Sequence, residues 1–257
     1  VILTVPLEGD TVFLECTDKN IPFGYMGSFT QGRKALLVDE NDSRLIDIPA
    51  LEPEEVLCNR TISVNRDSEE IHLTENQKGY KYEFFNYATK ELTKDRMDDI
   101  IRSEIFSGRA ELIGYTLDPT DRQTPEINLN ARYKMDGIYK EYGNNLIMAP
   151  FPLKIKDFEK PSKRTTGVQI DYPEFYTDTV SYDIPATQLS HIPGKVSIET
   201  DFGKYEISYE LKNSTLVCYK SFLLYAGKYP VERYEEFHQF IQTMKYNETK
   251  NIHLETF

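Results

Sequence analysis

Apolar and polar residues alternate along much of the chain, which is the period expected of β-strands with one buried face. In the clearest case, every odd position from Ile127 to Met135 is apolar. Shorter alternations recur with Asp, Asn, Ser or Gly between them, a pattern typical of antiparallel hairpins. The segments with apolar residues at every second position are Ile62 and Val64; Ile71 and Leu73; Tyr80, Tyr82 and Phe84; Ile113, Tyr115 and Leu117; Val180, Tyr182 and Ile184; and Tyr205, Ile207, Tyr209 and Leu211.

Two segments have the helical period instead. The first follows Thr93, whose hydroxyl can cap a first turn, and is predicted to end at Gly108. The second begins near Pro230, which a first turn tolerates. The chain is therefore predicted to be mainly β, with one or two antiparallel β-sandwich-type domains and two packed helices. The apolar stripes of the helices are Met97, Ile100, Ile101 and Ile105, and Tyr234, Phe237, Phe240, Ile241 and Met244.

The N-terminal segment is predicted to be a separate unit. Two runs rich in β-branched residues flank turn residues around Gly9, which predicts a β-hairpin. Pro49 and Pro53, with acidic residues beside them, indicate a linker. We therefore expect one unit at 1–50 and a β-rich accessory domain at 58–257, which in one interpretation divides further into about 58–155 and 164–257.

The charge of the chain limits its partners. Lys and Arg number 30 and Asp and Glu 42, so the net charge is -12 at pH 7. Such a surface repels phosphate backbones and anionic lipid headgroups, which excludes nucleic acid as a partner. No apolar run approaches the roughly 20 residues that a membrane-spanning helix needs, so no membrane-spanning segment is predicted.

The cysteines and histidines lack the spacing of a metal site. Cys16, Cys58 and Cys218 are far apart and odd in number, which fits neither a zinc ligand set nor a disulfide framework. None of the 4 histidines has a partner histidine three or four positions away. We therefore predict no metal and no cofactor, and we expect the cysteines to be partly buried as small apolar residues.

One segment near the N-terminus has the pattern of part of an active site. Residues 10–17 read Asp-Thr-Val-Phe-Leu-Glu-Cys-Thr, and residues 22–25 read Pro-Phe-Gly-Tyr. With further motifs in order downstream, nearly the whole chain resembles bacterial transglutaminase-like proteins, which have a β-rich N-terminal domain, a papain-like core and a C-terminal domain of unknown function. The downstream motifs are Gly32-Arg33 with Leu36-Leu37-Val38, Asp178-Thr179-Val180, Phe202-Gly203-Lys204-Tyr205, and Tyr229-Pro230 with Tyr234 and Phe237-His238-Gln239-Phe240.

The resemblance implies a core that works through a Cys, His and Asp-type triad, in which the carboxylate orients the His. Glu15 stands at the carboxylate position, where the family more usually has Asp before a small residue and Thr. The resemblance puts the family's His on a strand leading into Val1, and its Cys further upstream. We therefore expect the chain to begin within a strand of a longer protein and to be catalytically inactive alone.

The resemblance implies that residues 1–50 are the C-terminal remnant of a transglutaminase-like core. The function implied is that of a non-catalytic C-terminal region that supports this core or docks a substrate or partner. The expected partner is that upstream core, with a protein or a glycan as a further candidate. Family members are usually exported, so the resemblance implies a periplasmic or extracellular location. An alternative function is a β-sandwich module that binds a glycan or a peptide through exposed aromatic residues. The tyrosines predicted near loops are Tyr139, Tyr142, Tyr172 and Tyr176.

Overall fold

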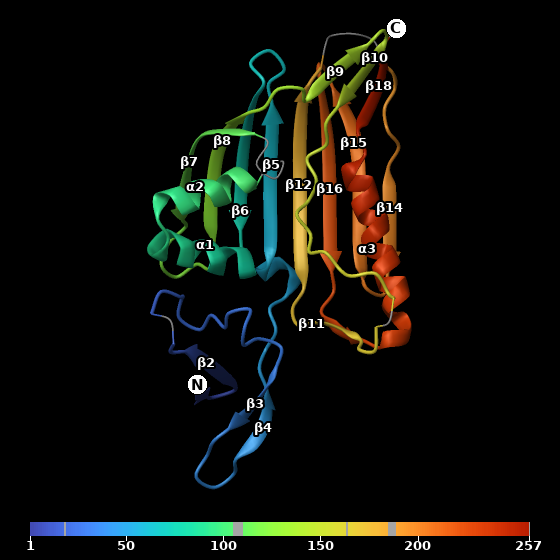
Figure 1. Ribbon diagram of the computed structural model, residues 1–257. Helices are drawn as coiled ribbons and strands as arrows, with labels where there is room; N and C mark the ends of the chain where they lie inside the picture. Colours follow the sequence, from blue (N-terminus) through green and yellow to red (C-terminus); the bar gives the residue numbers. More distant parts are fainter. Residues whose placement is uncertain (18, 105–109, 163, 185–188, 257) are drawn as a thin grey trace.

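The computed structural model describes residues 1–17, 19–104, 110–162, 164–184 and 189–256. Its main feature is an eight-stranded sheet with the strand order β14-β15-β16-β12-β5-β6-β8-β7 (Figure 1). The prediction of a mainly β fold is confirmed. The strands are β5 (Leu57–Val64), β6 (Glu70–Gln77), β7 (Glu111–Pro119), β8 (Ile127–Lys134), β12 (Glu174–Asp183), β14 (Val196–Thr200), β15 (Gly203–Lys212) and β16 (Thr215–Leu224).

Neighbouring strands of this sheet are antiparallel, except for β12 and β5, which pair in parallel. The expectation of antiparallel pairing is therefore wrong at the centre of the sheet. The reason is that β5 and β12 are distant in the sequence and no hairpin joins them, so their direction is not set by a turn. Through this pair, the sheet runs without interruption from strands before residue 155 to strands after residue 164.

Three helices cover one face of the sheet: α1 (Gly79–Glu91), α2 (Lys94–Ser103) and α3 (Tyr234–Thr249). In Figure 1, α1 and α2 lie over the half that contains β6 and β8, and α3 lies over the half that contains β14 and β15. The ring of Phe240 in α3 stacks on Phe222 of β16, and the Tyr133 hydroxyl of β8 donates to the carbonyl of Ile101 in α2. Through these contacts the helices pack on the sheet, and the hydrophobic core lies between them.

Two predicted helices are confirmed and one predicted strand is wrong. The Thr93 hydroxyl accepts the Arg96 N–H and caps α2, whose predicted continuation to Gly108 lies outside the described residues. The alternation of Tyr80, Tyr82 and Phe84 belongs to α1 and not to a strand. The helix forms because Tyr82, Phe85 and Ala88, three residues apart, are the positions buried against the sheet.

The N-terminal segment forms two separate two-stranded sheets, β1 (Ile2–Leu7) with β2 (Asp10–Glu15) and β3 (Lys34–Leu37) with β4 (Arg44–Asp47). The predicted hairpin around Gly9 is confirmed, with Gly9 at a φ of 83°. In Figure 1 these strands lie beyond the lower ends of β5 and α1.

The remaining strands form two small sheets. One has the order β13-β18-β10-β9, and the other pairs β11 with β17. The bounds are β9 (Tyr139–Tyr142), β10 (Asn145–Met148), β11 (Val168–Ile170), β13 (Leu189–His191), β17 (Gly227–Tyr229) and β18 (Ile252–Thr256).

Candidate functional site

Glu15 is the last residue of β2, and three hydrogen bonds hold its carboxylate. The backbone N–H and the hydroxyl of Thr17 donate to Oε1 at 2.9 Å and 2.6 Å, and the Thr30 hydroxyl donates to Oε2 at 3.4 Å. Partial burial acts to raise the pKa of Glu15, but these hydrogen bonds outweigh burial and lower the pKa below its ordinary value. The carboxylate is therefore ionised at neutral pH. Of its two oxygens, Oε2 accepts the longer and weaker hydrogen bond.

A cavity of about 400 Å³ opens beside this carboxylate. It is lined by the end of β2, by residues between Lys19 and Gly24, and by Arg122 and Gln123 from the connection between β7 and β8. The cavity thus lies between the N-terminal segment and the end of the large sheet. An ionised carboxylate in its wall can accept a hydrogen bond from an imidazole or an ammonium group.

No imidazole that the structure describes lies beside Glu15. Cys16 also lines the cavity, and its Sγ lies 3.5 Å from the carbonyl oxygen of Leu14. Within the described ranges, no histidine lines this cavity. The four histidines lie instead on other elements, namely β6 (His72), β13 (His191), α3 (His238) and β18 (His253).

The three cysteines are free, and two of them are buried as expected. Burial raises the pKa of the Cys58 thiol to about 11 and that of the Cys218 thiol to about 12. A nucleophilic cysteine needs a lowered pKa, so neither buried thiol is suited to attack. The expectation of burial is wrong for Cys16, which is exposed because it follows the last residue of β2 into a turn.

A second carboxylate ties the loop beside the cavity to the helical layer. Glu83 of α1 accepts hydrogen bonds from the Tyr25 hydroxyl at 2.8 Å and from the N–H and hydroxyl of Ser28, both at 2.6 Å. This contact was missed from the sequence because Glu83 falls in the segment whose alternation predicts a strand. It fixes the loop that follows Glu15 relative to the large sheet.

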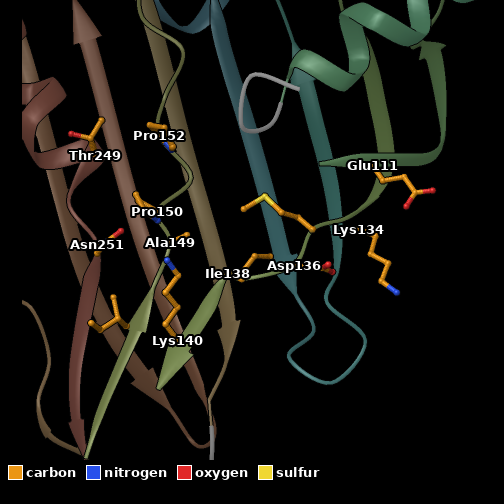
Figure 2. Close-up of a pocket in the computed structure, with 13 residues that line it drawn as sticks. Glu111, Lys134, Asp136, Ile138, Lys140, Ala149, Pro150, Pro152, Thr249 and Asn251 are labelled. Carbon is orange, nitrogen blue, oxygen red and sulfur yellow. The ribbon is translucent and has the colours of Figure 1, made fainter. Parts of the chain in front are cut away.

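A larger cavity, of about 1010 Å³, lies beyond the end of β8 (Figure 2). Figure 2 shows Pro150, Pro152 and Thr249 on one side of it and Ile138 and Asp136 on the other. The cavity has the size of a small-ligand site. Its lining residues include no cysteine and no histidine, so they offer no triad-type chemistry.

The four tyrosines predicted near loops do not share one exposed surface. Tyr139 packs edge-on against the ring of Tyr182, and its hydroxyl donates to a backbone carbonyl. Tyr172 and Tyr176 are partly buried and line another cavity. Only Tyr142 is open to solvent, at 62% exposure.

In the described parts of the chain, no three His, Cys, Asp or Glu side chains come together in a way that could hold a metal ion. None of the described helices is long and apolar enough to cross a membrane.

Comparison with known proteins identifies one region. Residues 144–254 match the family model of a domain of unknown function, DUF3858. The DUF3858 region supplies β12, β14, β15 and β16 to the large sheet and α3 to the layer above it, whereas β5, β6, β7, β8, α1 and α2 lie outside the match. No curated protein and no solved structure matches the chain.

A row of buried charged side chains crosses the edge of the DUF3858 region. Lys220, Asp178, Arg60 and Glu75 are register neighbours on β16, β12, β5 and β6. Arg60 donates to Asp178 from Nε at 3.0 Å and from Nη2 at 2.5 Å, and Lys220 donates to Glu248 of α3 at 2.9 Å. Because the charges are paired and covered, this row serves to hold the sheet and its helices together.

Proposed function

We propose that this chain is the non-catalytic C-terminal region of a transglutaminase-like protein. Residues 1–50 would complete a papain-like core, and residues 58–257 would form the accessory domain that supports it. In this proposal Glu15 is the carboxylate that orients a histidine supplied by the core. The exported location expected from the resemblance belongs to the same proposal.

The observation that carries the proposal is the distribution of exposed apolar side chains. Fifteen large hydrophobic side chains are exposed among the described residues, and nine of them precede residue 46. Four of the other six are tyrosines, whose hydroxyls favour water. The nine are Val1, Leu3, Val5, Leu7, Phe23, Phe29, Leu36, Val38 and Leu45.

These side chains lie mostly on the two isolated hairpins. Leu3, Val5 and Leu7 share one face of β1, and Leu36 and Leu45 are register partners across β3 and β4. A two-stranded hairpin is only marginally stable in water, and further strands or a packed face are needed to stabilise it. Exposed apolar faces of this kind mark interaction surfaces, which supports a larger β unit as their partner.

The hydrogen bonds of Glu15 suit the proposed role. Thr17 occupies Oε1 with two short bonds and fixes the direction of the carboxylate, while among the described residues Oε2 accepts only the longer bond from Thr30. Oε2 can therefore accept an imidazole N–H from the side of the cavity. A carboxylate in this position selects the tautomer of the histidine and stabilises its protonated form.

The first test is an activity assay on the chain alone. We expect no transglutaminase, peptidase or amidase turnover, because no described imidazole lies beside Glu15 or Cys16. Turnover that disappears in Cys16→Ala would overturn the proposal.

The second test is binding to a papain-like core taken from a transglutaminase-like protein, measured by calorimetry. We expect a complex that Val5→Lys weakens at least about tenfold, because a buried charge at an apolar contact is costly. The matched control is Leu211→Lys, an exposed apolar strand residue of the large sheet, which should leave binding unchanged. No complex, or equal effects of the two substitutions, would contradict the proposal.

A further inference from the structure

The strand β14 forms one edge of the large sheet, and its outer side pairs with no other described strand. Proteins usually protect such edges with bulges, prolines or covering elements. The opposite edge strand, β7, has a register shift between Leu112 and Gly114 and ends at Pro119. By contrast, β14 pairs in unbroken register and contains no proline. The two edges are therefore not equally protected.

The direction of the free backbone groups on β14 follows from its turn. Thr200 and Gly203 are register partners on either side of a two-residue turn, so they form a hydrogen-bonded pair. Such pairs recur at every second position of an antiparallel ladder. The N–H and C=O groups of Ser197 and Glu199, which lie between those positions, consequently point away from β15 and toward the open edge.

A groove of about 480 Å³ runs beside this edge, between β14 and α3. Val196 and Ile198 of β14 are only half-buried, although their register partners on β15, Ile207 and Tyr205, are 3% and 1% exposed. The drop in burial at the last strand shows that the groove leaves apolar surface open. Ile198 provides this surface, while Phe202 and Phe240 form the buried floor of the groove at 2% and 3% exposure.

The charges at the groove favour a basic occupant. Arg233 lies with its Cζ 4.8 Å from the ring centre of Phe202, and it forms ion pairs with Asp201 at 2.9 Å and Glu236 at 2.8 Å. One cation between two carboxylates leaves a net negative charge there. The start of the α3 region adds two further exposed acidic residues, Glu232 and Glu235.

These charges argue against a second copy of the chain as the occupant. Each copy has a net charge of -12, so two copies that paired through β14 would repel each other overall. A short extended peptide with basic side chains meets no such repulsion.

We propose that β14 and the groove beside α3 bind an extended peptide by strand addition. The peptide would pair its backbone with Ser197 and Glu199 and would place apolar side chains at alternate positions against Val196 and Ile198, on the face of the sheet that α3 covers. A Lys or Arg on this same face, at the end of the peptide nearest Thr200, would lie near Asp201 and Glu236.

The test uses a fluorescent eight-residue acetylated peptide in which Val alternates with Thr and Lys replaces the first and last Val, titrated with the full chain. We expect saturable binding that Ser197→Pro weakens about tenfold, because proline removes the N–H that pairs with the peptide. Ser197→Ala is the matched control, since it keeps the N–H, and it should change affinity less than about twofold. Proline is tolerated on an edge strand, and circular dichroism checks the fold of both variants.

A second variant tests the groove independently of the strand. Thr243 is exposed on α3 and lines the groove, so Thr243→Trp should fill it and weaken the peptide about tenfold as well. A peptide with Glu in place of Lys should bind at least about tenfold more weakly. No binding at millimolar peptide, binding insensitive to both variants, or a dimer of the chain that Ser197→Pro dissolves would each overturn the proposal.

Discussion

The pair of Arg60 and Asp178 predicts a large cost for removing one charge. Their side chains are 9% and 1% exposed, and Asp178 lies beside Lys220 as well as Arg60 in the register of the sheet. In Asp178→Asn, Arg60 would keep its hydrogen bonds to the carbonyls of Phe151 and Pro152 but would lose its counter-charge. Breaking a buried pair from one side costs about 3–5 kcal/mol. The retained carbonyl bonds place the expected loss near the lower limit, at about 3 kcal/mol.

The assay is urea unfolding followed by circular dichroism, with the free energy extrapolated to water. The same loss should lower the melting temperature by roughly 6–12 °C for a chain of this size. The double variant Arg60→Met with Asp178→Leu should recover most of the stability, because no unpaired charge remains in it. The surface control is Asp47→Asn, which breaks a pair with Lys34 whose side chains are 81% and 66% exposed, and it should cost less than about 1 kcal/mol. A loss below about 1 kcal/mol for Asp178→Asn would refute the reasoning.

Three further predictions concern single sites. Glu83→Gln removes the charged acceptor of three hydrogen bonds, so amide hydrogens of the N-terminal loop should exchange at least about tenfold faster, while unchanged exchange would contradict this contact. Gly203→Ala would place a Cβ against the backbone carbonyl oxygen of Leu223 on β16 and should cost at least about 2 kcal/mol in urea unfolding. The control is Gly114→Ala, because a Cβ at that position meets nothing within 4 Å. A thiol reagent at pH 8 should modify Cys16 in the folded chain and spare Cys58 and Cys218, because burial raises the pKa of these two thiols to about 11 and about 12. A second reactive thiol before unfolding would argue against their burial.

The alternation of apolar residues was sufficient to predict most strands of the large sheet. It worked where one face is covered and the other is open, as in β8, where Ile127 and Tyr133 are buried and Asn130 and Arg132 are exposed. It failed at α1, because a short aromatic run fits a period of two as well as a period of 3.6. Only the sheet beneath the helix decides that Tyr82 and Phe85 are buried and that Tyr80 is exposed.

The alternation of buried and exposed positions was sufficient to predict that Arg60 and Asp178 point into the core. Arg60 lies two and four residues before the buried Ile62 and Val64, so its side chain points to the same face of β5. Asp178 likewise lies two and four residues before Val180 and Tyr182 in β12. Their pairing could not be predicted, since it depends on the parallel contact between two strands that are far apart in the sequence. The same limit applies at Glu15: the resemblance indicates the residue, whereas the bond from Thr30 depends on the path of an irregular loop.

The DUF3858 region shares its large sheet with strands that lie outside the match. It contributes one half of the large sheet, and its strand β12 makes ten register pairs inside the region with β16 and eight outside it with β5. Isolation of residues 144–254 would uncover that edge of β12 along most of its length and leave Asp178 buried without Arg60. Both consequences are unfavourable, since an open strand edge invites aggregation and an unpaired buried charge is costly. We therefore expect the strands from β5 to β8 to be needed for the DUF3858 region to fold, and the row of charges from Lys220 to Glu75 joins the two halves of the sheet at their centre.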